Sequence, residues 1–353
     1  MTDPMKKLRV GILGCAKIAT RSLIPSFAAH SRFVVDAIAS RDPAKACSVA
    51  SQYVCRAMDY QTLVADPDID LVYVPLPTGL HAEWVAKCLH AGKHVLCEKS
   101  LASTLPEVEA LVAIARQKGL LLIENFQFRF HSQHQMIRAI LDSGKLGEIR
   151  CFRSSFGFPP FQDPSDIRYS KALGGGALLD AGAYTLKSIS VVLGEGFRVK
   201  AASRWQPADS EVDLGGGAYL ENDAGVMVEV AFGFNHFYQC NYEIWGSKGH
   251  LIAKRAFTAP PGFTPEVVVH TAAGGETMEL LPDDHFANML THCAISVETH
   301  SFEAEYRNCL TQSDLIQQTR ERSLESFPNP IIERNARDTI CCKSSVGLKK
   351  IDE

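Results

Sequence analysis

Short apolar runs alternate with amphipathic stretches along the first third of the chain. The apolar runs are typical of buried parallel strands and span residues 8–13, 33–40, 70–76, 94–98 and 120–126. The stretches between them predict helices over residues 17–29, 43–53, 59–65, 80–91 and 104–118. Repeated strand–helix units with short links predict a parallel, doubly wound sheet, whose ligands bind at the carboxyl ends of its strands.

The pattern changes after about residue 130. One more helix, 132–141, is followed by strands with long links at 149–157, 199–205, 216–220, 226–234, 241–245 and 267–271. A triple glycine leads into a helix that reaches about residue 192, and two long helices, 285–299 and 303–322, come last. We therefore predict an α/β Rossmann domain over 1–126, an α+β domain with an open, mostly antiparallel sheet over 127–328, and a tail over 329–353.

Composition narrows the classes of function. The 353 residues are 46% hydrophobic and 22% charged with a net charge of −4, so no global basic field favours nucleic acid or an anionic membrane. No apolar run approaches the roughly 20 residues that span a bilayer, and the N-terminus lacks the apolar region of a signal peptide. The eleven cysteines are scattered without C-x-x-C spacing, which favours buried thiols in a reducing cytoplasm over disulfides or a metal site.

The turn after the first strand is the first candidate for chemistry. It occupies the six positions of the dinucleotide fingerprint G-x-G-x-x-G, with alanine at two of the glycine positions. Backbone N–H groups and a helix N-terminus could hold a diphosphate there, and the alternative is an ordinary strand–turn–helix. The residues of the turn are Gly14, Cys15, Ala16, Lys17, Ile18 and Ala19.

The end of the second strand indicates which nicotinamide cofactor is bound. NAD-binding versions of the fold place an acid there to hold the ribose 2′-hydroxyl. This chain has Ser40 and Arg41, which suit a 2′-phosphate because arginine pairs with phosphate bidentately. Asp42 is the counter-evidence, although it also suits the N-cap of the next helix. We therefore expect NADP(H) rather than NAD.

Two polar motifs predict the reacting groups. Glu98 and Lys99 close the fourth strand at the ligand edge, which places both beside the cofactor, and a lysine there is rarely needed for packing. Asp180 and Tyr184 share one helix face, and the tyrosine hydroxyl could protonate a developing alkoxide. We expect a nearby lysine to lower the Tyr184 pKa from its usual value of about 10. The alternatives are a surface lysine and a structural tyrosine with a capping aspartate.

Two further residues carry weaker signals. His81 follows the third strand and could donate a hydrogen bond to the cofactor, or it could begin a helix without touching a ligand. Arg168 lies in a predicted loop, where an arginine is either functional or solvated.

These motifs, in this order and spacing, resemble the glucose–fructose oxidoreductase/inositol dehydrogenase/MocA (Gfo/Idh/MocA) family over about residues 6–325. Residues 166–169, 174–180, 241–243 and 255–258 are further similar to the NADPH-dependent dTDP-sugar 3-ketoreductases of deoxysugar pathways such as the kijanose pathway. The resemblance implies a catalytic Lys99 with Tyr184 as its partner, and reduction of the C3 ketone of a nucleotide-linked deoxyhexose.

The resemblance also implies roles for individual residues. It places Ser40 and Arg41 at the 2′-phosphate, and it lines the cofactor with Tyr60, Leu76, His81, Arg168 and Asp180. Besides Lys99 and Tyr184, it places three residues at the sugar nucleotide, namely Arg21, Tyr242 and Thr258. An open sheet that makes subunit contacts implies a homodimer or homotetramer.

One residue departs from the family pattern. Ser100 follows Lys99, where the family usually has proline. A cis Lys–Ser bond would cost about 2.5–4 kcal/mol, so we expect this bond to be trans, or strained if the fold imposes cis.

Two other functions stay open. The first is an NAD(P)-dependent dehydrogenase of a free polyol, inositol or dihydrodiol, which would share the catalytic residues. The second is a non-catalytic regulator that senses a nucleotide, although such a protein would need neither Lys99 nor Tyr184.

Overall fold

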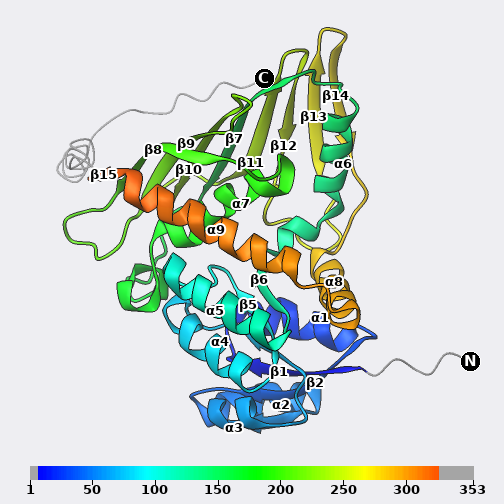
Figure 1. The fold of residues 1–353 in the computed structure, drawn as a ribbon, viewed down its shortest axis with the longest axis vertical. Coiled ribbons are helices and arrows are strands. Elements are labelled where there is room, and N and C mark those ends of the chain that lie inside the picture. Colours follow the sequence, from blue (N-terminus) through cyan, green and yellow to red (C-terminus); the bar gives the residue numbers. More distant parts are fainter. Residues whose placement is uncertain (1–6, 326–353) are drawn as a thin grey trace, which may run out of the picture.

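Two domains lie one above the other in the computed structural model, which describes residues 7–325 (Figure 1). One domain holds a parallel sheet between helices, and the other holds a broad sheet with helices on one face. The fold class predicted from the sequence is confirmed. The predicted tail, 329–353, lies outside the described residues.

The first domain is built on a six-stranded parallel sheet with the order β3-β2-β1-β4-β5-β6. Its strands are β1 (Leu8–Leu13), β2 (Phe33–Ala39), β3 (Arg56–Met58), β4 (Leu71–Val74), β5 (His94–Glu98) and β6 (Leu122–Asn125). Its helical segments are η1 (Ala19–Leu23), α1 (Ile24–Ala29), α2 (Pro43–Tyr53), α3 (Tyr60–Ala65), η2 (Thr78–Leu80), α4 (His81–His90) and α5 (Leu105–Lys118). The strand order reverses between β1 and β4, and doubly wound sheets bind ligands at that reversal.

The second domain is built on a nine-stranded sheet with the order β14-β13-β12-β11-β7-β10-β9-β8-β15. Within the described chain, β10 pairs parallel with β7 and β15 with β8, and the other neighbours pair antiparallel. Its strands are β7 (Ile149–Gly157), β8 (Arg198–Trp205), β9 (Gly215–Glu221), β10 (Met227–Gly233), β11 (Gln239–Gly246), β12 (Gly249–Ala253), β13 (Glu266–Thr271), β14 (Gly274–Glu279) and β15 (Ser323–Glu325).

The remaining helices connect the two domains and cover the second sheet. Figure 1 shows α6, α7 and α9 on one face of that sheet, with α8 beside the first domain. The segments are η3 (Gln127–Phe130), α6 (Ser132–Asp142), η4 (Ile167–Tyr169), η5 (Lys171–Leu173), η6 (Leu178–Gly182), α7 (Ala183–Val192), α8 (His285–Thr299) and α9 (Glu303–Arg322).

Local sequence signals set the helix ends. Asp42 caps α2, because its carboxylate accepts the Ala44 N–H at 2.9 Å, as the sequence predicts. Thr104 and Glu107 form a capping box at the start of α5, and Gly119 ends that helix with a φ of +64°. These ends fix where each loop leaves the sheet and therefore where the site residues lie.

The last two helices belong to both hydrophobic cores. Phe286 and Leu290 of α8 and Tyr306 of α9 are buried in the core of the first domain. Leu315 and Ile316, further along α9, are buried in the core of the second domain. Helix α9 therefore joins the two domains through packing as well as through the chain.

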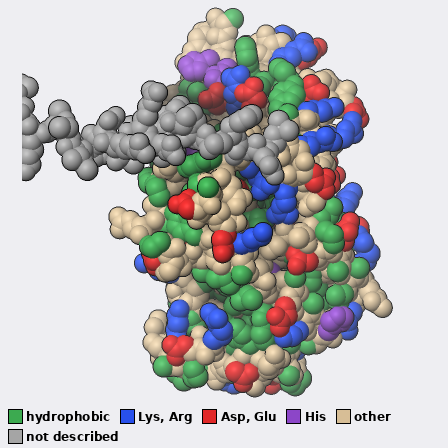
Figure 2. Space-filling model, turned by 90° about the vertical axis from the view of Figure 1, so that its left-hand side faces the viewer, with side chains coloured by type: hydrophobic (Ala, Val, Ile, Leu, Met, Phe, Trp, Pro, Cys, Tyr) green, Lys and Arg blue, Asp and Glu red, His purple; other side chains and the backbone are tan. Residues whose placement is uncertain are grey.

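The ligand edge of the parallel sheet lies on the side shown in Figure 2. Strand β1 runs from right to left in Figure 1, so the carboxyl ends of the parallel strands point toward that side. Basic and acidic side chains are interspersed on this face. Over residues 7–325, no helix has both the length and the apolar character needed to cross a membrane.

Candidate active site

Side chains from both domains meet at the carboxyl end of β5. Lys99 follows this strand, and its side chain is 13% exposed. Its ammonium pairs with the carboxylate of Asp180 in η6, and it lies 3.2 Å from the carbonyl oxygen of the same residue. It also lies 5.0 Å from the ring centroid of Tyr184 in α7. The structure thus brings together Lys99, Asp180 and Tyr184, as the sequence predicts.

Asp180 lies between two cations. Besides Lys99, it accepts a hydrogen bond from Nε of Arg168 at 2.6 Å, and Arg168 also reaches Asp166 at 3.2 Å. Burial by itself raises the pKa of Asp180, but the charges of Lys99 and Arg168 outweigh burial and lower the pKa to about 2. The carboxylate is therefore ionised at neutral pH, and it orients both cations. Arg168 belongs to the site and is not a solvated loop residue.

Glu98 lies in a hydrogen-bonded network beneath the site. One carboxylate oxygen accepts from the Tyr73 hydroxyl at 2.6 Å and from the Asn125 amide at 2.7 Å. Burial raises the Glu98 pKa, whereas these hydrogen bonds and Lys99 oppose the rise. Tyr73 and Asn125 are fully buried and were not predicted as site residues. Neither lies in a recognisable motif, because the contact depends on the pairing of β4, β5 and β6.

Tyr184 is enclosed by aromatic side chains and is 9% exposed. Four rings lie with centroids 5.1–5.9 Å from its own, those of Phe126, Phe128, Phe156 and Phe257. Gln127 hydrogen-bonds to the Tyr184 side chain, a contact that the sequence did not indicate.

The expectation that a lysine lowers the Tyr184 pKa is wrong. Burial, followed by the negative charges of Glu98 and Asp180, raises this pKa well above its usual value. The charge of Lys99 is compensated by Asp180, so it does not reverse that effect. Tyr184 therefore keeps its proton throughout the neutral pH range.

The Lys99–Ser100 peptide bond is cis, so the expectation of a trans bond is wrong. That expectation used only the local preference of the peptide unit. In the fold, Ser100 is 2% exposed and is held by hydrogen bonds from other elements, which a local argument does not include.

The turn after β1 can approach a diphosphate closely. Gly14 has a φ of +133°, and a Cβ there would lie 3.1 Å from the Leu76 side chain, so glycine is required. Cys15 and Ala16 continue the turn, Lys17 and Ile18 begin the helix, and Ala19 opens η1. The turn therefore has the backbone freedom that a dinucleotide cradle needs.

Ser40, Arg41 and Tyr60 lie together at the carboxyl end of β2. Arg41 is exposed, and it contacts Tyr60 through its charge and through hydrogen bonds. Burial raises the Tyr60 pKa, and Arg41 opposes this rise. Asp42 directs its carboxylate to the N-terminus of α2 instead, which removes the main argument for NAD.

His81 begins α4, and its contacts favour the alternative in which it does not touch a ligand. It is fully buried, with Nδ1 2.8 Å from the carbonyl oxygen of Ser100 and Nε2 2.7 Å from that of Leu76. Both ring nitrogens therefore face backbone oxygens, and neither is available to a ligand. His81 ties the chain after β4 to the chain after β5.

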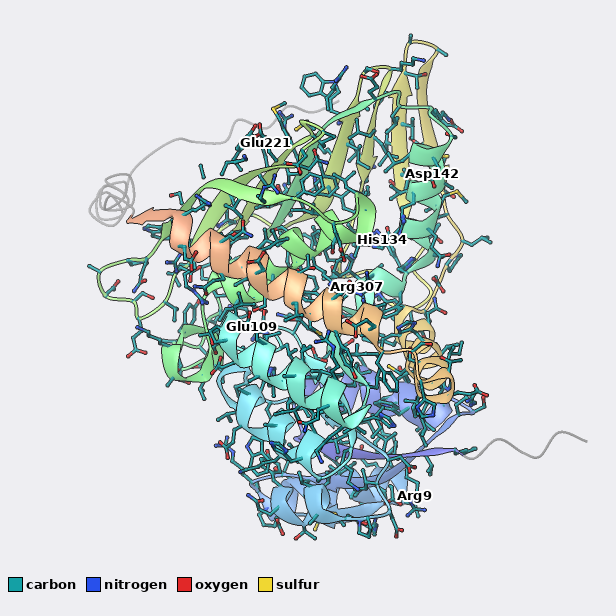
Figure 3. The ribbon with its side chains drawn as sticks, in the orientation of Figure 1. Arg9, Glu109, His134, Asp142, Glu221 and Arg307 are labelled. Atoms are coloured by element: carbon teal, nitrogen blue, oxygen red, sulfur yellow. The ribbon has the colours of Figure 1, made fainter. Side chains whose placement is uncertain are left out.

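The three predicted sugar-nucleotide residues differ in how far they are exposed. Tyr242 of β11 is fully buried, and its hydroxyl lies 2.8 Å from Nδ1 of His134, so it is not offered to a ligand. Figure 3 labels His134 on α6, between that helix and the sheet. Thr258 is partly exposed and lies 2.8 Å from the Tyr238 hydroxyl. Arg21 is exposed on η1.

Comparison with known proteins agrees with this fold. The profile described as "Oxidoreductase family, NAD-binding Rossmann fold" matches residues 8–126, and the GFO/IDH/MocA C-terminal domain matches residues 134–252. A dTDP-3,4-didehydro-2,6-dideoxy-alpha-D-glucose 3-reductase of Saccharopolyspora spinosa is 42% identical over 81% of this chain and 86% of its own length. The corresponding reductase of Actinomadura kijaniata is 40% identical over 89% of this chain and 95% of its own length.

A solved structure shows the same fold. The 3-ketoreductase KijD10 from Actinomadura kijaniata, in complex with NADP and TDP-benzene, superposes with a TM-score of 0.88 at 38% identity. The match covers 91% of this chain and 99% of that one. The chain belongs to the Gfo/Idh/MocA oxidoreductase family.

Proposed function

We propose that this enzyme uses NADPH to reduce a keto group, at C3, of a nucleotide-linked deoxyhexose. The observation that carries the proposal is the Lys99–Asp180–Tyr184 cluster, which sets two proton-bearing groups side by side at the ligand edge of the Rossmann sheet. The identity with dTDP-sugar 3-reductases over most of the chain supports the substrate class.

The residues around the turn after β1 fit a nicotinamide dinucleotide. Gly14 allows the backbone to approach the diphosphate, and Ser40 with Arg41 suits a 2′-phosphate. Leu76 lies against Gly14 in this turn, and Arg168 pairs with Asp180 beside Lys99, so both are proposed cofactor contacts. When bound, the nicotinamide supplies the hydride that reduces the carbonyl carbon.

The chain itself supplies the proton. The raised pKa keeps the Tyr184 hydroxyl protonated, and Lys99 is held beside it by its ion pair with Asp180, so both groups can donate to the oxygen of the reacting carbonyl. One of the two delivers the proton, and the other orients the oxygen and stabilises its developing charge. Exposed Arg21 and partly exposed Thr258 remain proposed contacts of the sugar nucleotide.

The proposal is tested by following nicotinamide absorbance with NADPH and with NADH. Substrates are dTDP-linked 3-keto sugars made in situ, with free polyols and aldoses run in the oxidative direction. We expect NADPH oxidation with the nucleotide-linked ketones alone. Activity confined to free polyols or aldoses would identify a dehydrogenase of free sugars and contradict the proposed substrate class.

The reacting groups are tested with Tyr184→Phe. We expect the variant to bind NADPH like the wild type and to lose turnover by about 10²–10⁴-fold, the usual contribution of a positioned general acid. Tyr219→Phe is the matched control, since its hydroxyl bonds only to Glu221 on the open sheet. Wild-type turnover in Tyr184→Phe would exclude this residue as the proton donor.

A further inference from the structure

Ser100 crosses from one domain to the other directly beside Lys99. Its hydroxyl donates a hydrogen bond of 2.9 Å to the carbonyl oxygen of Leu179 in η6. Lys99 in turn reaches the carbonyl oxygen of Asp180 at 3.2 Å. Two consecutive side chains of the first domain therefore meet two consecutive carbonyl groups of the second. The acceptors lie in a π-helical turn, a local geometry that is frequent at functional sites.

The rest of Ser100 is held within the first domain. Its carbonyl oxygen lies 2.8 Å from Nδ1 of His81, and the next residue, Leu101, donates its N–H to Glu124 at 2.8 Å. These two contacts fix the backbone, so the side-chain hydroxyl has a defined direction. Of the three contacts, the hydroxyl bond is the one that reaches the second domain.

The position of η6 relative to Lys99 decides whether the contacts between Lys99 and Asp180 can form. The Asp180 carboxylate must reach Lys99 and Arg168 together, while Lys99 stays 5.0 Å from the Tyr184 ring centroid. A shift of η6 away from β5 would lengthen the contact between Lys99 and Asp180. The Ser100–Leu179 bond opposes that shift one residue away from the ion pair.

We propose that the Ser100 hydroxyl is a positioning group that sets Lys99 against Asp180 and Tyr184 across the domain boundary. A residue without a side-chain donor at this position, such as proline, could not make this tie. The inference rests on the proposed function, because it presumes that Lys99 and Tyr184 act on a substrate.

The test compares Ser100→Ala and Ser100→Thr with the wild type. Loss of the hydroxyl should lower kcat about tenfold, with the Kd for NADPH within about twofold, because a lost buried hydrogen bond displaces the reacting groups. Threonine keeps the hydroxyl and should restore most of kcat. Thr319→Val is the matched control, since it removes a buried hydroxyl-to-carbonyl bond of 2.8 Å within α9.

A second readout does not depend on turnover. Acetylation of Lys99 by trace acetic anhydride, followed by mass spectrometry, should be severalfold faster in Ser100→Ala, because a poorly placed Asp180 holds the amine less firmly. It should be unchanged in Thr319→Val. Ser100→Cys, a weak donor of similar size, should be intermediate and replaces the alanine variant if that variant does not fold.

The outcomes separate the two proposals. A wild type that is inactive on every ketone contradicts the proposed function, and the acetylation rates then decide the role of Ser100 alone. Wild-type kcat together with wild-type Lys99 acetylation in Ser100→Ala overturns the positioning role. Equal losses of kcat in Ser100→Ala and Thr319→Val reduce Ser100 to a general stabilising residue and also overturn it.

Discussion

At the scale of single residues, Asp180 determines the charge of the site. It is the anion that Lys99 and Arg168 share, and its own charge adds to that of Glu98 in raising the Tyr184 pKa. Its charge therefore holds both cations in place and helps to keep the Tyr184 hydroxyl protonated. Removal of this charge would leave two cations close together without compensation.

The stability of the Asp180→Asn variant should depend on pH in a way that shows the loss of this charge. The folded-state pKa of about 2 lies below the ordinary value near 3.9, so the ionised carboxylate stabilises the fold above pH about 4, and this stabilisation is lost as the pH falls toward about 2. We expect the variant to be less stable than the wild type by about 2–3 kcal/mol near pH 7, with the difference shrinking below pH about 4. Urea unfolding across this pH range measures it.

The control for this variant is Asp223→Asn. That carboxylate is 83% exposed and pairs with Arg198 on the surface. A pair of this kind contributes little, so its stability should follow the wild type at every pH. A constant difference between Asp180→Asn and the wild type down to about pH 2 would contradict the assignment.

Arg41→Ala should separate the two cofactors. If the guanidinium binds a 2′-phosphate, its loss should raise the KM for NADPH by about 10–100-fold, the size of a charge-assisted hydrogen bond, and leave NADH unchanged. Arg32→Ala is the control, because Arg32 lies at the opposite end of β2 and pairs with Glu298. Equal losses with both cofactors would count against the 2′-phosphate contact.

Residues whose place follows from a strand end or a short motif were predicted from the sequence. Lys99 directly follows β5, and Tyr184 shares a helix face with Asp180. The order and spacing of these residues were therefore sufficient to predict that they belong to the site. Tyr73 was not predicted, because its partner Glu98 lies on the neighbouring strand and not nearby in the sequence. Tyr242 was misjudged because a motif gives a position in β11 and does not show which side of the sheet the ring occupies.

At the scale of elements, a buried ion pair docks η3 onto α9. Arg129 pairs with Glu305, their side chains are 10% and 5% exposed, and His292 of α8 lies 2.8 Å from the same carboxylate. Burial raises the Glu305 pKa, but Arg129 and His292 lower it to about 2. The pair therefore stays ionised and joins η3 to α8 and α9, which come much later in the sequence.

Glu305→Gln should destabilise the protein strongly. It leaves the buried Arg129 charge uncompensated, which costs about 3–5 kcal/mol in comparable pairs. Replacing both partners, with Arg129→Met and Glu305→Leu, should restore much of the loss, since no buried charge remains. Urea unfolding near pH 7 measures both variants, and a double variant no more stable than Glu305→Gln would show that the charge is not the cause.

Helices were predicted from the sequence more accurately than strands. Helices α2 and α8, which begin at the N-caps Asp42 and Asp284, were predicted with the bounds observed, and so was α9. The strands β3, β12, β14 and β15 were missed. Three of them lie at or next to a sheet edge, and β3 and β14 are largely exposed, so their residues lack the apolar pattern that marks a buried strand.

At the scale of the whole molecule, α9 makes the two domains one packing unit. Its first half is buried in the core of the Rossmann domain, and its second half is buried in the core beneath the large sheet (Figure 1). The Tyr306 hydroxyl donates a hydrogen bond to the carbonyl oxygen of Leu120, which adds a polar contact between α9 and the Rossmann domain.

Thermal unfolding should therefore be a single transition. A domain whose core contains a helix shared with its neighbour loses that helix when the neighbour unfolds, so neither domain should persist alone. Differential scanning calorimetry should give one peak with equal calorimetric and van 't Hoff enthalpies, provided that unfolding is reversible. Two resolved peaks would show that α9 does not couple the domains.

The shared helices also have a consequence for the order in which the protein is made. All strands of the parallel sheet have left the ribosome once Asn125 has emerged. The apolar surface that α8 and α9 cover stays exposed until Cys309 has also emerged. The first domain to be synthesised is thus the one that must wait for the end of the chain. Translation that stops early leaves a nascent sheet with an uncovered apolar face, which is a ready target for chaperones and proteases.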